Sequence, residues 1–218
     1  MEMQMKKRNC EIDFNVSFAA QRWQHFEFTI NGDKHEFTCS AAVSEMLGDF
    51  IDVLYELYIE SNDEARATKV EYMHDNPDSN TINGIAADFT WDNEGDVLNW
   101  KISRRLYEPE IMLDIQLNYD SFDFGEKSYQ YRIPYFDLCY AVAKATTALL
   151  KQTGIIGYHF LGEWDSIDIH HFLYVKHLGI FRKPIPYSPF PHEEFDPYTA
   201  SDKKTSFLDE MKLLAFEM

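Results

Sequence analysis

The chain has 218 residues, with 37 Asp and Glu against 20 Lys and Arg, so its formal net charge is −17. Hydrophobic residues make up 45% of the sequence and aromatic residues 16%, which is typical of a folded globular protein and excludes a disordered one. Binding to the phosphates of a nucleic acid requires a basic surface, so the charge argues against a nucleic-acid partner.

The first forty residues predict three strands. Residues 10–18 alternate between apolar and polar side chains, and so do residues 23–30; this period indicates a strand with one buried face. Asn31-Gly32 predicts a tight hairpin turn, because both residues tolerate a positive φ. Residues 35–39 form the returning strand.

A helix is predicted next. Apolar residues recur every three or four positions from Val43 to Tyr58, which indicates an amphipathic helix of about five turns. Ser40 can cap this helix, because its hydroxyl can accept a hydrogen bond from a free amide of the first turn. The polar run 61–63 ends it.

The middle of the chain predicts a series of strands joined by short turns. A short strand at 69–73 precedes a polar, turn-rich loop at 74–83. Alternation of apolar and polar residues then marks strands at 85–91, 98–106, 111–119 and 128–133. Consecutive strands with short connections favour an antiparallel meander.

The last third is predicted to be mainly helical. Pro134 suits the first turn of a helix, and Gly154 suits its C-terminal end. A second helix is predicted over 166–178, ending before Gly179. Residues 183–198 alternate prolines with aromatic and aliphatic residues, which indicates an extended segment that either straps across the sheet or forms an exposed arm. A short helix over 206–216 closes the chain.

These elements predict an α+β fold. We expect an antiparallel meander sheet of about seven to eight strands with helices packed on one face and a short C-terminal helix. Residues 1–182 would form one α+β domain, and the proline-rich strap and helix of 183–218 would pack on it. An open sheet also leaves an edge strand through which two copies could form a homodimer.

The sequence predicts a cytoplasmic protein. No apolar segment follows the basic N-terminus, as a secretory signal would require, and no stretch is long and apolar enough to span a membrane. The three cysteines, Cys10, Cys39 and Cys139, are too few and too scattered for a disulfide framework or a zinc site, and we expect free thiols.

The polar side of the first helix is strongly acidic. Residues 40–65 contain seven carboxylates and no Lys or Arg. Like charges three or four positions apart on a helix repel by a few tenths of a kcal/mol, whereas an ordinary solvated face mixes signs. Five of the seven make the predicted partner-binding surface: Glu45, Asp49, Asp52, Glu56 and Glu60. This surface is either a solvated acidic face or a docking surface for a basic protein.

A second candidate site lies between Asp165 and His177. Asp168 and His171 are three positions apart and so share a helix face, as metal ligands on helices often do. No established metal motif accompanies them. Asp165 or Ser166 would more simply cap the helix, with Asp168 favoured by the helix dipole, so we expect no metal and no cofactor.

The sequence contains no motif for nucleophilic catalysis or phosphate binding, and no catalytic residue is predicted. Small acidic α+β proteins without such motifs include bacterial immunity proteins, which neutralise basic toxic nucleases; by this analogy we expect an inhibitor or protein-binding module. One alternative is a metal- or carboxylate-dependent hydrolase with a site near Asp165 to His177. Another is a binder of small apolar ligands, enclosed by Trp91, Trp100, Tyr129 and Tyr131; an ordinary aromatic core is its rival.

Arg104 and Arg105 are adjacent on a predicted strand, so their side chains point to opposite faces. They therefore make a poor phosphate clamp, and we expect structural salt bridges instead.

Overall fold

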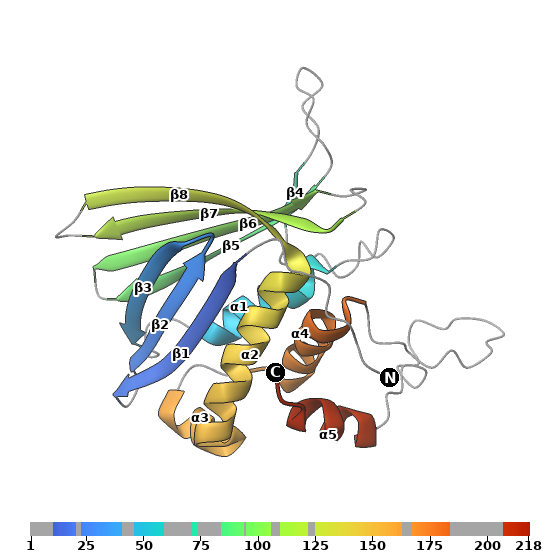
Figure 1. Ribbon diagram of the computed structural model, residues 1–218. Coiled ribbons are helices and arrows are strands. Elements are labelled where there is room, and N and C mark those ends of the chain that lie inside the picture. Colours follow the sequence, from blue (N-terminus) through green and yellow to red (C-terminus); the bar gives the residue numbers. More distant parts are fainter. Residues whose placement is uncertain are drawn as a thin grey trace.

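A computed structural model describes residues 11–20, 23–40, 46–58, 71–73, 84–93, 95–105, 110–121, 125–162, 167–183 and 207–218. Within these ranges the chain forms two antiparallel sheets with helices packed against them (Figure 1). The predicted α+β class is confirmed.

The smaller sheet is the N-terminal one. Its strands are hydrogen-bonded in the order β1-β2-β3, with β1 at Ile12–Ala20, β2 at Trp23–Ile30 and β3 at Asp33–Ser40. Asn31 and Gly32 form the turn between β2 and β3 with φ values of 53° and 93°, as the hairpin prediction required.

The larger sheet is a meander in sequence order. Its strands are β4 at Glu71–Met73, β5 at Gly84–Asn93, β6 at Asp96–Arg105, β7 at Met112–Ser121 and β8 at Gly125–Pro134. The prediction of one sheet with about seven to eight strands was wrong in this respect: the eight described strands divide between two sheets. Each sheet has one apolar face, and stacking these faces buries both.

Aromatic rings fill the space between the two sheets. The ring of Trp91 on β5 lies 4.4 Å from that of Phe26 on β2 and 5.1 Å from that of Trp100 on β6, measured between centroids. Phe50 of helix α1 lies 5.0 Å from Trp100. Trp91 donates a hydrogen bond from Nε1 to the carbonyl of Met46, at 3.3 Å. The two tryptophans thus belong to the aromatic core.

The helices lie on one side of the larger sheet in Figure 1, as predicted. They are α1 at Met46–Leu57, α2 at Tyr135–Thr153, α3 at Ile155–Gly162, α4 at Ile169–Phe181 and α5 at Phe207–Ala215. Helix α2 contacts β1 and α4, and α1 lies between β5 and α4. Within the described ranges, no helix is long and apolar enough to cross a membrane.

Most of the predicted helix ends are correct. Pro134 precedes the first turn of α2, and Gly154 ends the helix with φ 69°. Helix α3 was not predicted. Helix α4 also runs past Gly179 to Phe181, so the predicted end was wrong. A Cβ at Gly179 would lie 2.6 Å from the backbone nitrogen of Tyr140, which shows that this glycine serves the close crossing of α2 and α4.

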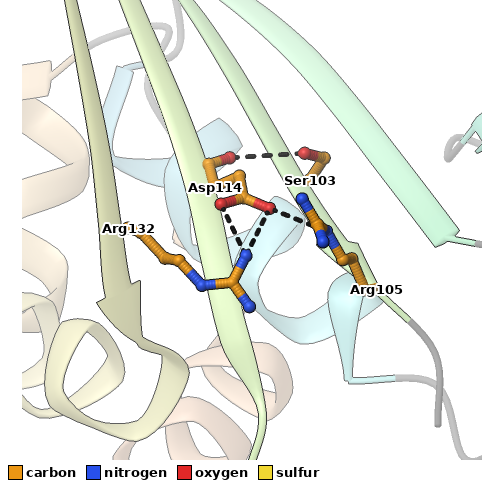
Figure 2. A network of polar contacts seen from close by, with 4 residues as sticks. All are labelled: Ser103, Arg105, Asp114 and Arg132. Carbon is orange, nitrogen blue, oxygen red and sulfur yellow. Dashed lines mark hydrogen bonds and ion pairs between the residues drawn. The ribbon is translucent and has the colours of Figure 1, made fainter. Parts of the chain in front are cut away.

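A network of polar contacts joins β6, β7 and β8 of the larger sheet (Figure 2). Asp114 accepts two hydrogen bonds from Nη1 of Arg132, at 3.1 and 3.2 Å, and its carboxylate lies 3.4 Å from Nε of Arg105. Arg104 points the other way and donates a hydrogen bond to the carbonyl of Leu57, at 2.9 Å. The two adjacent arginines therefore face opposite sides, as predicted. The predicted salt bridge is present for Arg105, whereas the contact of Arg104 with Leu57 is a hydrogen bond to the backbone.

Helix α5 matches the predicted C-terminal helix. Lys176 of α4 is fully buried, and its ammonium donates hydrogen bonds to the carbonyls of Leu214, at 3.1 Å, and Phe216, at 2.9 Å. Burial lowers the pKa of Lys176 to about 8.

Residues 184–198 of the predicted strap, and Cys10, lie outside the described residues. Cys39 and Cys139 are buried, and Cys139 is a free thiol. Burial raises the pKa of Cys139 to about 12, which makes this thiol unreactive.

Candidate functional site between helices α1 and α4

The predicted acidic surface is partly visible in the structure. Glu45 and Glu60 lie outside the described residues. Asp49, Asp52 and Glu56 follow one another along a single half-buried stripe of α1, while the opposite side of the helix is buried in the core. The helical spacing therefore brings these three carboxylates together as predicted.

Helix α4 meets this stripe through a histidine. Nδ1 of His171 lies 2.7 Å from Oδ1 of Asp52, and the side chains are 22% and 28% exposed. The two residues are 119 positions apart in the sequence. This contact brings together two segments that were predicted as separate candidate sites. It also gives Asp52 a hydrogen-bond partner within the fold.

Asp168 caps α4. Its Oδ1 accepts hydrogen bonds from the backbone amides of His170, at 2.8 Å, and His171, at 3.2 Å. Asp165 and Ser166 lie outside the described residues, and α4 begins at Ile169, so the predicted cap at 165 or 166 was wrong. Burial opposes ionisation of Asp168, but the amide hydrogen bonds and the nearby histidines outweigh it and lower its pKa.

Aromatic side chains pack against the imidazole rings of His170 and His171. The ring of Tyr55 on α1 stacks on that of His171, with centroids 4.0 Å apart and planes at 19°. It also meets the ring of His170 edge-on, at 5.3 Å and 67°. Tyr174 packs perpendicular to Tyr55 from the next turn of α4, at 5.1 Å. These contacts restrict the rotation of both histidine rings.

The electrostatic environment of His171 is negative. Burial works against its protonation, but the hydrogen bond that its ring donates to Asp52 and the charges of Asp52, Asp168 and Glu56 outweigh burial, so the pKa of His171 is raised. Carboxylates from α1 and from the start of α4 therefore surround one imidazole. Together these carboxylates give the surface a negative electrostatic potential.

A second polar cluster joins the two sheets. His35 of β3 is buried; its Nδ1 lies 3.1 Å from the hydroxyl of Tyr119, and its Nε2 lies 2.7 Å from that of Tyr131. Tyr131 donates a hydrogen bond to the carboxylate of Asp33, at 3.1 Å. Because that proton is committed to Asp33, Nε2 of His35 must donate to Tyr131, and Nδ1 then accepts from Tyr119. These hydrogen bonds therefore fix the tautomer of His35, with its proton on Nε2.

A cleft of about 330 Å³ borders this hydrogen-bonded cluster. It is lined by His35, Tyr119 and Tyr129, and Glu36 and Asp120 are among its polar residues. The four aromatic residues proposed to enclose a small apolar ligand are thus divided. Trp91 and Trp100 pack in the core, whereas Tyr129 lines this polar cleft and Tyr131 joins the hydrogen-bonded chain beside it.

We expect His35 to make the protein less stable as the pH falls. Burial lowers its pKa from the ordinary value of 6.5, although the charge of Asp33 acts in the opposite direction. Below about pH 6.5 the unfolded chain takes up a proton that folded His35 resists, so the free energy of unfolding decreases. An NMR titration, with His35 assigned from the spectrum of His35→Gln, should give a midpoint below 6.5. A midpoint at or above 6.5 would contradict the assignment of a neutral ring.

Comparisons with protein-family models, with curated proteins and with solved structures find no match for this chain.

Proposed function

We propose that this protein binds a basic protein partner through the acidic surface formed by α1 and the start of α4, as an inhibitor of the immunity-protein kind does. The observation that carries the proposal is the convergence of Asp49, Asp52 and Glu56 on one stripe of α1 with Asp168 of α4 close beside it. The protein as a whole carries a net charge of −17, which would attract such a partner at long range.

The residues of the surface have different tasks. Asp52 is hydrogen-bonded to His171, so it fixes α4 against α1, and it adds its negative charge to the surface. Asp49 and Glu56, one turn before and one turn after it on the half-buried stripe, are placed to meet Lys or Arg side chains of a partner. Charge complementarity of this kind raises the association rate and selects partners by sign.

The test is affinity capture from a lysate of the source cell at low and high salt, followed by mass spectrometry. One bait is the unchanged protein, and a second carries Asp49→Lys and Glu56→Lys. The matched control carries Asp88→Lys and Glu126→Lys, which make the same change in net charge at exposed positions on β5 and β8 of the larger sheet. We expect a basic protein that is captured by the unchanged bait and by the control, released at high salt, and lost from the α1 variant.

The affinity of the captured protein for each variant would then be measured. We expect the α1 variant to bind at least about ten-fold more weakly than the control, because reversing a charge places like charges in contact. Equal capture by the two variants would contradict the proposal, since the attraction would then depend on net charge alone or on another surface.

A further inference from the structure

Three potential metal ligands meet at the start of α4. One carboxylate oxygen of Asp168 and one ring nitrogen each of His170 and His171 lie within 4.8 Å of one another. Asp168 and His170 are exposed and His171 is half-buried, so an ion can reach the cluster from solvent. An ion held at about 2.0–2.2 Å from each ligand atom would bring these atoms closer together than that limit, so the side chains would move toward one another on binding.

The donor set selects the class of metal. Two imidazole nitrogens and one carboxylate oxygen suit zinc and the neighbouring first-row transition metals, whereas calcium and magnesium prefer sites made of oxygen ligands. Three protein ligands also leave a coordination position open to water or to another ligand.

The surrounding residues position these ligands. Nδ1 of His171 is hydrogen-bonded to Asp52 on α1, so Nε2 is the ring nitrogen that would bind a metal. Metal-bound histidines commonly donate their other ring nitrogen to a carboxylate in this way. Oδ1 of Asp168 accepts the two amide hydrogen bonds of the helix cap, which leaves Oδ2 as its ligand atom. Tyr55 stacks on the ring of His171 and fixes its plane.

We propose that Asp168, His170 and His171 form a binding site for a divalent transition-metal ion of the zinc class, with Asp52 as the positioning residue for His171. The proposal does not depend on the binding of a basic partner, because the partner contacts are assigned to Asp49 and Glu56. Asp52 and Asp168 contribute to both, as charge in one case and as positioning group and ligand in the other.

The experiment uses the full chain after treatment with a chelator. Binding of Zn²⁺ is measured by calorimetry, and Co²⁺ reports imidazole coordination through its visible absorption bands. The test variants are His170→Ala, the His170→Ala/His171→Ala pair and Asp168→Asn. Asparagine caps a helix as well as aspartate does, so Asp168→Asn preserves α4 while removing the charged ligand. The control is His159→Ala, which removes an exposed histidine of α3 outside the cluster.

We expect one ion per chain, with about ten-fold or greater loss of affinity in His170→Ala and Asp168→Asn and complete loss in the double variant. Asp52→Asn should weaken binding by about ten-fold, as changes to groups that orient a metal ligand do. The His159→Ala variant should bind like the unchanged protein. The proposal is overturned if the unchanged protein binds no Zn²⁺, or if the double variant binds as tightly as His159→Ala. Either result would leave the partner experiment with Asp49 and Glu56 unaffected.

Discussion

Gly179→Ala is expected to destabilise the protein by about 2 kcal/mol or more, within the usual range for overpacking a close contact. The added Cβ would lie 2.6 Å from the backbone nitrogen and 2.7 Å from Cα of Tyr140. These are atoms of the α2 backbone, which cannot move aside as a flexible side chain could. Helices α2 and α4 must therefore separate, or α4 must shift along its axis. Urea unfolding followed by circular dichroism would give the change in the free energy of unfolding.

Gly157→Ala is the matched control. Gly157 is also helical, but the nearest atom to an added Cβ is Cβ of Thr153 at 3.8 Å, an ordinary contact. Because alanine is favoured over glycine in helices by about 1 kcal/mol, this variant should be as stable as the unchanged protein or more so. If both variants changed stability in the same direction, the close crossing at Gly179 would not be the cause.

Arg182→Met is expected to cost about 3 kcal/mol. Asp137, in the first turn of α2, is only 4% exposed and is paired with Arg182, which follows the end of α4. Removing the cation leaves a buried carboxylate without its ion-pair partner, which typically costs 3–5 kcal/mol. The lower end of that range applies, because Arg182 itself is half-exposed. Thermal or urea unfolding measures the loss.

A second substitution tests this explanation. Asp137→Asn removes the buried charge, so the Arg182→Met/Asp137→Asn pair should recover much of the stability lost by Arg182→Met alone. Lys151→Met provides a comparison at the other end of α2, where Lys151 forms an exposed ion pair with Glu217; it should leave stability unchanged within error. No recovery in the double variant would show that Arg182 stabilises the fold by packing rather than by charge.

Local signals predicted most of the elements of this fold. The hairpin at Asn31-Gly32 and the ends of α2 at Pro134 and Gly154 follow from backbone chemistry that acts within a few residues. The division into two sheets could not be predicted in the same way, because alternation shows that a strand has a buried face but not what covers it. Gly179 was misinterpreted for a similar reason: a glycine that ends a helix and one that permits a close crossing are identical in sequence.

The sequence predicted the two parts of the candidate site separately. The helical period placed Asp49, Asp52 and Glu56 on one stripe, and it placed Asp168 and His171 on one face of a second helix. Nothing in the sequence pairs Asp52 with His171, since the contact depends on how α1 and α4 pack and no local pattern records it. The addition of His170 to the cluster was missed as well, because neighbouring helical residues ordinarily point in different directions.

The separation of 119 positions between Asp52 and His171 has a consequence for protein synthesis. Helix α1 is made early, but its acidic stripe acquires its histidine only after the larger sheet and α2 have been translated and α4 has emerged. A ribosome-bound fragment that ends before α4 therefore carries the carboxylates without the ring they surround. The assembled surface thus marks a chain whose translation has passed α4, and a partner that recognises it would discriminate such chains from shorter nascent ones.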